Sequence, residues 1–337
     1  MKAIGFKTSL PITEEKSFIL FETAKPVATG KNVLVKIEAI SVNPVDYKVR
    51  QNSAKNIELE NPKIIGWDAV GVIESIGEDV TLFEPGDTVF YAGDLTKPGC
   101  NAEYQLIDER IVALAPETIS PAEAAALPLT ALTAWEILFD RIRIIPEKDT
   151  GKSILIIGGA GGVGSIAIQL AKKVAGLTVL ATASRPETIE WCSTCGADYV
   201  VNHKDLVNEV RAAGFKHVDY ILDFVDANSY WDAMAELIKP QGHIASITGS
   251  SEPIALNKLK NKSVSFSWEL MYTRSMFETE DMIEQHYILT SIANLIDKKE
   301  IFSTLQTTLK GFTVENFKQA HALLESGKTI GKVVIEY

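Results

Sequence analysis

Apolar and polar positions alternate along roughly the first 115 residues, and this period of two is typical of short, half-buried strands. The alternation is clear at residues 33–39, and residues 69–76 are rich in side chains that favour strands. From Ser120 the pattern changes to an alanine-rich stretch that favours helix and begins at Pro121. We therefore expect a mainly β segment that ends near residue 123.

Strand and helix patterns then alternate along the chain. Strands are expected at residues 153–157, 178–183, 199–201, 218–224, 243–247 and 263–268, and helices at residues 163–175, 186–195 and 230–238. This alternation predicts a parallel sheet with helices on its faces. A further helix at 280–298 and a strand-like ending at 331–335 indicate a return to the first segment. We predict an α/β protein with domains at 1–123, 124–272 and 273–337, the last completing the first.

The composition is that of a folded protein with more than one domain. Of 337 residues, 46% are hydrophobic and 23% are charged, far from the disordered regime. A net charge of −11 disfavours binding to nucleic acid and to anionic membrane surfaces. The first six residues lack the pattern of a secretory signal, and no apolar run reaches bilayer length, so we expect a cytoplasmic protein.

Cysteine is sparse, with three residues in the chain, which indicates a reducing compartment without disulfides. Cys192 and Cys195 form a C-x-x-C pair, but no second pair or histidine cluster would complete the four ligands of a structural zinc site. The pair lies just before Gly196, and glycine commonly ends helices. We expect two thiols in the last turn of a helix and no metal site.

A glycine-rich loop joins the strand 153–157 to the helix predicted after it. It contains G-x-G-x-x-G at Gly159, Gly161 and Gly164. In this motif the glycines permit a tight turn, let the backbone approach a pyrophosphate and let the helix pack closely on the strand, while the helix N-terminus attracts the anion. The glycines could serve only as a tight turn, but the flanking strand and helix favour a dinucleotide site. Its expected residues are Gly159, Ala160, Gly161, Gly162, Val163 and Gly164.

The end of the second strand, residues 182–186, decides which dinucleotide is expected. An acidic residue there would bind the ribose 2′-hydroxyl of NAD. Ser184 and Arg185 occupy this place instead, and residues 182–186 contain no carboxylate. A guanidinium binds a 2′-phosphate with two charged hydrogen bonds, so we expect NADPH. The alternative is that Ser184 only caps the helix starting at Pro186, while Arg185 is solvated.

Further cofactor contacts are expected at the carboxyl ends of other strands, because ligands of open α/β sheets bind there. Phe224 and Val225 end one strand, Ile247 and Thr248 end another, and we expect both pairs to border the nicotinamide. His203 lies just beyond the third strand and is a candidate contact for the adenosine phosphate. Its alternative role is that of a surface residue.

Four stretches, in this order, resemble the medium-chain dehydrogenase/reductase superfamily, specifically its zinc-free quinone oxidoreductase branch, often labelled zinc-type alcohol dehydrogenase-like. They are residues 41–47, 66–71 with 86–89, 126–134 and 158–172. The resemblance covers nearly the whole length. It implies a GroES-like, mainly β catalytic domain joined to a Rossmann domain with a doubly wound parallel sheet, and an active site in the cleft between them.

The sequence departs from the zinc-dependent members of that superfamily at their metal-ligand positions. Asn43 stands where they have cysteine, Trp67-Asp68 replaces their His-Glu, and their last cysteine position falls near Leu129. The cysteines of their structural zinc are also missing, leaving Cys100 alone. Because tryptophan and leucine cannot coordinate zinc, we expect no catalytic zinc.

The matched stretches also contain candidates for the chemistry. Asn43 and Asp46 are expected to order the floor of the pocket, and Tyr47 to donate its hydroxyl to a developing oxyanion. Thr130 is expected to contact the ribose or the carboxamide of the nicotinamide half.

Simpler roles for these residues stay open. Asp46 could pair with Lys48 or Arg50, residues 43–44 could only form a turn, and Tyr47 could be a packed aromatic residue.

A metal-free site favours acceptors that spread charge through a conjugated system. We therefore expect hydride transfer from NADPH to a quinone or an enone, as the resemblance also implies. Two alternatives are an NADPH-binding structural or regulatory protein with little catalysis, and a zinc alcohol dehydrogenase. The apolar strand 264–268 would form an exposed sheet edge, which this family commonly covers by dimerisation, so we expect a homodimer.

Overall fold

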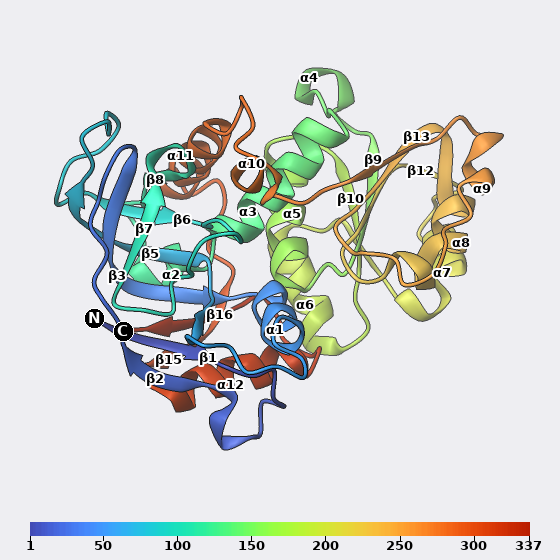
Figure 1. The fold of residues 1–337 in the computed structure, drawn as a ribbon. Helices are drawn as coiled ribbons and strands as arrows, with labels where there is room; N and C mark the ends of the chain where they lie inside the picture. The colour runs from blue at the N-terminus through green and yellow to red at the C-terminus, as the bar shows by residue number, and fades with distance from the viewer. The chain divides into compact units, whose positions relative to one another are not determined.

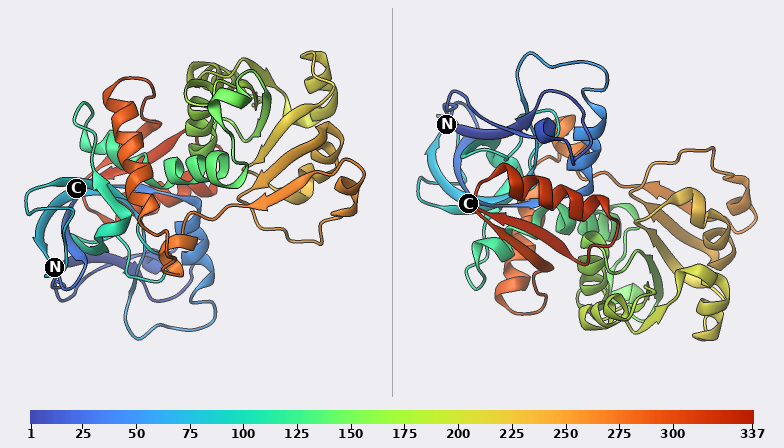
Figure 2. Two further views of the ribbon diagram at one scale, coloured as in Figure 1. Left: turned by 90° about the horizontal axis from the view of Figure 1, so that it is seen from above. Right: turned by 90° about the horizontal axis from the view of Figure 1, so that it is seen from below.

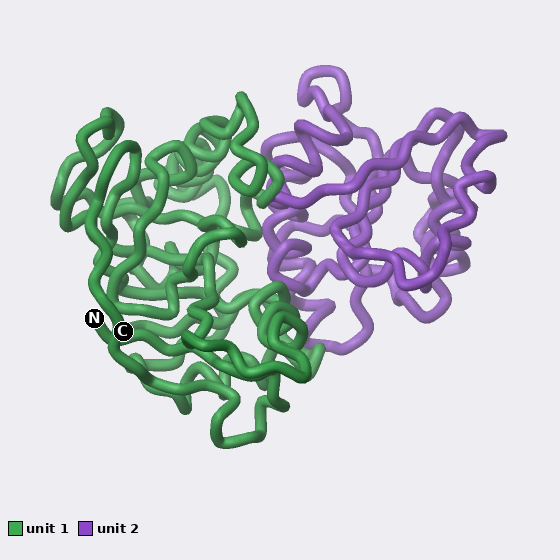
Figure 3. The backbone as a smooth tube through the Cα atoms, viewed as in Figure 1, with its two compact units in different colours: residues 1–132, 272–337 green, residues 133–271 purple.

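The computed structural model describes residues 1–337 as two compact units. Unit 1 contains residues 1–132 and 272–337, and unit 2 contains residues 133–271 (Figure 3). The chain passes from unit 1 to unit 2 inside helix α3 (Pro128–Trp135). The division expected near residue 123 falls in helix α2 (Pro121–Ala125), which is capped by Ser120 and packs on strands of unit 1.

Unit 1 is a mainly β unit, as expected, and contains two sheets. The larger has seven strands, six of them in the order β15-β16-β3-β5-β6-β8, with β7 paired to β3; the smaller has the order β2-β1-β4 (Figure 1). The strands are β1 (Lys2–Phe6), β2 (Ile19–Glu22), β3 (Asn32–Val42), β4 (Lys63–Ile64), β5 (Asp68–Ile76), β6 (Thr88–Tyr91), β7 (Tyr104–Asp108), β8 (Val112–Leu114), β15 (Leu305–Lys310) and β16 (Lys332–Glu336).

The long strand β3 organises the larger sheet, because it pairs with β5, β7 and β16. Its pairing with the last strand is antiparallel and places Val333 opposite Val42. This register brings the residue before Val333 close to the residue after Val42. The C-terminal strand therefore contributes directly to the site described below.

The other helices of unit 1 surround these sheets. Helix α12 packs on β15 and β16, beside which it lies in Figures 1 and 2. Helix α11 packs on β8. The bounds are α1 (Pro44–Asn52), α10 (Thr273–Met276), α11 (Glu284–Asp297) and α12 (Val314–Glu325), with 3₁₀ turns at Glu15–Ser17 and Glu109–Ile111.

Unit 2 is a doubly wound parallel sheet, which confirms the predicted fold class. Its six strands have the order β11-β10-β9-β12-β13-β14, and every pairing is parallel. The order reverses between β9 and β12, where such sheets bind ligands. The strands are β9 (Ser153–Ile157), β10 (Thr178–Thr182), β11 (Tyr199–Val201), β12 (Val218–Asp223), β13 (Ile238–Ser246) and β14 (Ser265–Trp268).

The helices of unit 2 join these strands and bury their apolar sides on the sheet. Helix α5 packs on β9 and β10, and α8 packs on β12 and β13. The bounds are α4 (Pro146–Asp149), α5 (Gly162–Lys173), α6 (Pro186–Cys195), α7 (Leu206–Ala212), α8 (Ala227–Leu237) and α9 (Asn257–Lys260), with a π-helix at Glu136–Arg141 and a 3₁₀ turn at His203–Asp205. None of the helices of the chain combines the length and apolarity needed to cross a bilayer.

Two predicted elements have different starts in the structure. Helix α11 begins at Glu284 rather than at residue 280, because the Asp281 carboxylate accepts hydrogen bonds from Thr279 and Arg274 and holds a turn there. Strand β13 begins at Ile238 rather than at residue 243, since Ile238 already pairs with Val218. Its polar residues and proline hide this start in the sequence.

Candidate functional site

The entrance to helix α1 holds the first group of predicted residues. Asn43 precedes the helix with an extended backbone, and Pro44 is its first residue, where the missing N–H costs nothing. The Asn43 backbone N–H donates to Asp46 Oδ2 at 2.7 Å. Asp46 therefore braces the helix start and is bonded to neither Lys48 nor Arg50, the partners of the simpler alternative.

The Asn43 side chain turns away from the helix and joins a buried ionic network. Its Nδ2 donates to Asp68 Oδ2 at 3.1 Å, and Lys332 Nζ donates to Asn43 Oδ1. Lys332 also donates to Asp68 Oδ2 at 3.0 Å, in an ion pair whose side chains are 3% and 0% exposed. Asp68 Oδ1 accepts from the Leu129 backbone N–H at 3.1 Å. Asn43 and Leu129, two positions that matched metal ligands, and Asp68, which matched the acid beside the histidine ligand, thus meet in one network with Lys332.

Lys332 was absent from the predicted site. The sequence carried one signal for it, because a lysine opens the otherwise apolar run of β16 and is buried there. A buried lysine needs a partner of opposite charge. That partner, Asp68, lies far away in the sequence, so only the pairing of β16 with β3 reveals it.

The carboxyl groups near Lys332 are electrostatically perturbed. Burial raises the pKa of Asp46 to about 7, against the lowering effect of the Asn43 N–H and the Lys332 charge. Burial also raises the pKa of Asp68, although Lys332, Asn43 and the Leu129 N–H lower it. Asp46 Oδ1 is buried and has no hydrogen-bond partner. This oxygen can hold the proton that the raised pKa implies.

Tyr47 and Thr130, the other predicted residues of unit 1, lie in different surroundings. Tyr47 is half-buried on α1, and burial followed by the Glu325 charge raises its pKa. Thr130 is buried in α3 and its hydroxyl donates to the Leu127 carbonyl at 3.1 Å. Their predicted roles toward substrate and nicotinamide stay predictions.

The donor set around Lys332 does not fit a zinc ion. Zinc needs three or four thiolate, imidazole or carboxylate ligands, whereas an amide, an ammonium and one carboxylate meet here. No group of three or more His, Cys, Asp or Glu side chains in the structure could hold a metal. Cys192 and Cys195 are buried in the last turn of α6, before Gly196 with φ +108°.

In unit 2, the phosphate loop connects β9 to α5. Gly158, which precedes the motif, has φ +89° and makes the tight turn that the sequence assigned to Gly159. Gly159 is instead required for packing, since a Cβ there would lie 2.8 Å from Ala181 Cβ. A Cβ on Gly164 would lie 2.2 Å from the Gly158 carbonyl oxygen, so helix and strand approach as the motif predicts.

The outer part of this loop is open to a ligand. Ala160, Gly161, Gly162 and Val163 are partly exposed, and a Cβ on Gly161 would meet protein atoms only at 3.5 Å. The first amides of α5 have no acceptor within the helix and carry its positive dipole end. This arrangement fits a pyrophosphate group.

Arg185, the cationic residue expected to bind the 2′-phosphate, follows the end of β10 and has an acidic neighbour. Arg185, rather than Ser184, is the N-cap residue of α6. Arg185 Nε lies 3.2 Å from Glu187 Oε1, and both side chains are substantially exposed. Residues 182–186 contain no acid, but Glu187 follows directly after them, and its carboxylate competes with a phosphate for Arg185. An exposed pair of this kind is weak, at about 0–1 kcal/mol, so a phosphate can displace it.

Asp223, which the sequence prediction missed, connects the strand ends expected to border the nicotinamide. Its carboxylate is fully buried at the end of β12. Oδ1 accepts from the backbone N–H of Val225 at 3.0 Å, and Oδ2 accepts from the hydroxyls of Ser246 and Thr248 at 2.9 and 3.0 Å. The Ile247 N–H donates to the Asp223 carbonyl at 3.2 Å. The two predicted loops are therefore held together by one side chain.

The remaining predicted cofactor residues are partly or largely exposed. His203 opens the 3₁₀ turn after β11, and Phe224 follows Asp223. Val225 is 50% exposed and its side chain faces Gly158 of the phosphate loop. These positions are accessible to a ligand, and their contacts with one stay predictions.

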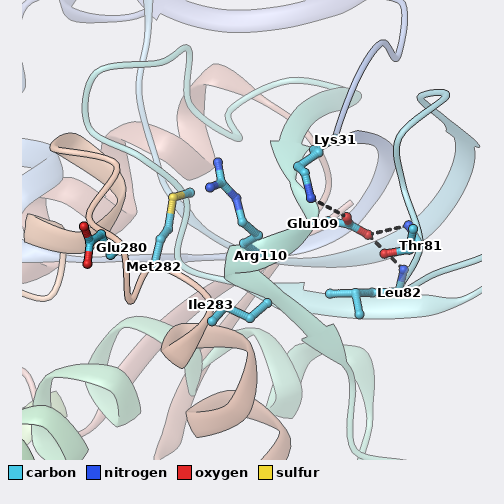
Figure 4. Close-up of a pocket in the computed structure, with 8 residues that line it drawn as sticks. All are labelled: Lys31, Thr81, Leu82, Glu109, Arg110, Glu280, Met282 and Ile283. Atoms are coloured by element: carbon cyan, nitrogen blue, oxygen red, sulfur yellow. Dashed lines mark hydrogen bonds and ion pairs between the residues drawn. The ribbon is translucent and has the colours of Figure 1, made fainter.

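A hollow on unit 1, shown in Figure 4, does not form part of the candidate site. Three of its four charged groups, Lys31, Glu109 and Arg110, are already paired within the protein. Glu109 is buried and accepts from the backbone N–H groups of Thr81 and Leu82, each at 2.8 Å. Arg110 makes two hydrogen bonds with Asp108, at 2.9 and 2.8 Å. The polar groups of this hollow therefore hold neighbouring loops together.

Comparison with known proteins identifies relatives along the whole chain. Residues 29–117 match the alcohol dehydrogenase GroES-like domain, and residues 162–285 match the zinc-binding dehydrogenase family. A zinc-type alcohol dehydrogenase-like protein of Staphylococcus aureus (strain Mu50) is 48% identical over 338 residues, which cover 99% of each chain. A 2-methylene-furan-3-one reductase of Solanum lycopersicum is 31% identical over 93% of this chain and 73% of its own.

Solved structures show the same fold. A candidate zinc-dependent alcohol dehydrogenase from Rhizobium etli CFN 42 superimposes with a TM-score of 0.95 at 46% identity, covering 100% of this chain and 98% of its own. The quinone oxidoreductase of Coxiella burnetii gives a TM-score of 0.81 at 27% identity, covering 100% and 99%. The GroES-like and Rossmann predictions for the two units are confirmed.

Proposed function

Because the chain belongs to the medium-chain dehydrogenase/reductase superfamily, we propose that it reduces quinones or α,β-unsaturated carbonyl compounds with NADPH, without a metal. The observation that carries this proposal is the ion pair of Lys332 and Asp68 with Asn43. Asn43 stands at a position that matches a metal ligand of zinc-dependent relatives, and the opposite charges of Lys332 and Asp68 balance within the network. An oxidoreductase of this kind must use an acceptor that needs no Lewis acid.

The features of unit 2 support NADPH as cofactor. The open phosphate loop fits a pyrophosphate, and Arg185 supplies a cation for a 2′-phosphate. Bound NADPH would supply the hydride. Asp223 would keep the loops after β12 and β13 in place beside the nicotinamide, since it bonds both of them.

Conjugated carbonyl compounds suit the groups of unit 1. Hydride addition moves negative charge onto the carbonyl oxygen, and conjugation spreads that charge, so hydrogen bonds suffice to stabilise it. The names of two relatives, a 2-methylene-furan-3-one reductase and a quinone oxidoreductase, agree with this substrate class.

The edge strand β14 supports the further proposal of a homodimer. It is the last strand of the sheet, and Trp268 on it is 48% exposed. An uncovered apolar edge favours pairing with a second copy. Light scattering should give about twice the chain mass of 36.9 kDa; a monomer at micromolar concentration would contradict this assembly.

A substrate panel tests the activity. Purified protein, treated with a chelator and analysed for metals, is mixed with NADPH or NADH and with quinones, enones, saturated ketones and primary alcohols. The proposal predicts NADPH oxidation with quinones or enones, unchanged after chelation, and slower oxidation of NADH. Activity only with alcohols, or activity that requires added zinc, would refute it.

A further inference from the structure

Several polar atoms of unit 1 are buried without a hydrogen-bond partner, and three of them belong to neighbouring residues: Asp46 Oδ1, Trp67 Nε1 and the Tyr272 hydroxyl. Their residues are 1%, 1% and 2% exposed. A buried donor without an acceptor costs folding free energy, because it loses its bond to water and gains nothing. These unpartnered groups lower the stability of the fold, so their presence in one region indicates a role in binding.

The three groups belong to one cluster beside the Lys332 network. The rings of Trp67 and Tyr272 are in edge contact, with centroids 6.3 Å apart and planes at 75°. Trp67 directly precedes Asp68, and Asn43 bonds both Asp68 and Asp46. Burial first, then the charges of Asp46 and Asp68, raise the pKa of Tyr272 well above its ordinary value. Tyr272 is therefore a protonated donor.

The chemistry of the cluster fits an uncharged oxygen acceptor. An indole N–H and a phenol O–H each need an acceptor atom, and one oxygen with two lone pairs can accept from both. A carboxylate or phosphate ligand is disfavoured, because the cation of this region, Lys332, is already paired with Asp68. A carbonyl oxygen accepts two hydrogen bonds and carries no charge until it is reduced.

We propose that Tyr272, together with Trp67, donates hydrogen bonds to the carbonyl oxygen of the substrate; this inference rests on the proposed function. When the electrophilic carbon of an enone or quinone gains a hydride, its π electrons shift toward that oxygen, and a proton from water completes the reduction. The Tyr272 hydroxyl keeps its proton and strengthens its hydrogen bond as the charge develops.

Tyr91 provides a matched control for Tyr272. It is 0% exposed, and its hydroxyl is also buried without a partner. The charge that acts on it is that of Cys100 rather than those of Asp46 and Asp68, and the ring in edge contact with Trp67 is that of Tyr272. Tyr91→Phe and Tyr272→Phe each remove one unpartnered hydroxyl and keep the ring. If both hydroxyls were only structural, the two variants would behave alike.

The experiment compares wild type, Tyr272→Phe and Tyr91→Phe. Each is assayed with p-benzoquinone and 2-cyclohexenone at saturating NADPH, and its thermal midpoint is measured without ligand. We expect Tyr272→Phe to lower kcat about 10²-fold, the usual effect of removing one oxyanion donor, with the KM for NADPH unchanged and the thermal midpoint equal or higher. Tyr91→Phe should stay within about threefold of wild type.

Wild-type kcat for Tyr272→Phe, or an equal loss in Tyr91→Phe, would overturn the assignment. A binding measurement separates failure of the Tyr272 assignment from failure of the proposed function. If wild type oxidises no NADPH with any acceptor, calorimetry with hydroquinone, the reduced form of p-benzoquinone, still tests the cluster. If hydroquinone binds Tyr272→Phe more weakly than Tyr91→Phe, the Tyr272 hydroxyl donates to a ligand oxygen. Equal affinity of hydroquinone for the two variants refutes this role.

Discussion

Lys332 Nζ lies 3.0 Å from Asp68 Oδ2, although 264 positions separate the two residues and both side chains are buried. A buried ion pair is sensitive to loss of one partner, because the remaining charge is left unpaired. Lys332 also bonds the Asn43 amide, so it fixes the orientation of that side chain. The pair therefore links the stability of unit 1 to the geometry of its candidate site.

Lys332→Met should reduce the free energy of unfolding by about 3–5 kcal/mol at neutral pH, measured by urea denaturation. The methionine fills a similar volume but leaves Asp68 without its cation. The double variant Lys332→Met/Asp68→Asn should recover a large part of this loss, because no buried charge remains. A single variant within 1 kcal/mol of wild type would contradict the role given to the pair.

Asp46 should make the stability depend on pH in a defined direction. Its pKa is about 7 in the folded protein against an ordinary value of 3.8, so the folded form holds a proton that the unfolded form releases. The resulting contribution is complete below about pH 3.8 and is lost as the pH rises through 7, by something on the order of 1–4 kcal/mol.

The matched variant is Asp46→Asn, which keeps an oxygen acceptor for the Asn43 N–H. Between pH 6 and pH 8 the unfolding free energy of wild type should fall relative to that of Asp46→Asn. The same slope in both proteins would show that Asp46 does not titrate in this range.

Arg185 and Glu187 should affect NADPH affinity in opposite directions. Arg185→Ala removes the proposed charged contact to the 2′-phosphate and should weaken NADPH binding about tenfold to a hundredfold, with little effect on NADH. Glu187→Gln frees Arg185 from an exposed ion pair and should strengthen NADPH binding by up to about fivefold. Nicotinamide fluorescence titrations measure both. Equal losses for NADPH and NADH in Arg185→Ala would indicate a structural role instead.

Asp223→Ala should release the loops after β12 and β13 from each other. We expect a KM for NADPH at least tenfold higher, since about four hydrogen bonds at the ends of β12 and β13 are lost. Thr248→Val removes only one of these bonds and should show a smaller change. The comparison of kcat and KM for the two variants checks this. An unchanged KM in Asp223→Ala would mean that these loops do not position the cofactor.

Unit 2 was predictable because its signals are local. The apolar strand, the glycine loop and helix α5 follow one another without interruption, and each has the period expected of it. The loop needed one change of detail: the positive φ belongs to Gly158 rather than to Gly159. Six parallel strands then follow from the alternation alone.

The site in unit 1 was only partly predictable because its partners are distant in sequence. Asn43 and Asp46 were identified, but Lys332 reaches them through the pairing of β16 with β3. Tyr272 enters unit 1 at the point where the chain returns from unit 2, so no motif marks it. Glu187 was not predicted, because the choice between NAD and NADPH was based on the residues that end the strand, and Glu187 lies in the first turn of α6. A local sequence pattern does not show which residue from a distant segment contacts the site.

The measurement that tests the central claim most directly is isotope transfer. NADPH deuterated at C4 of the nicotinamide is incubated with chelator-treated protein and 2-cyclohexenone, and the reduced ketone is analysed by mass spectrometry, with the analogous deuterated NADH as comparison. The account predicts one deuterium on the β-carbon of the product, transferred faster from NADPH. A product without deuterium, or transfer only after zinc is added, would contradict it.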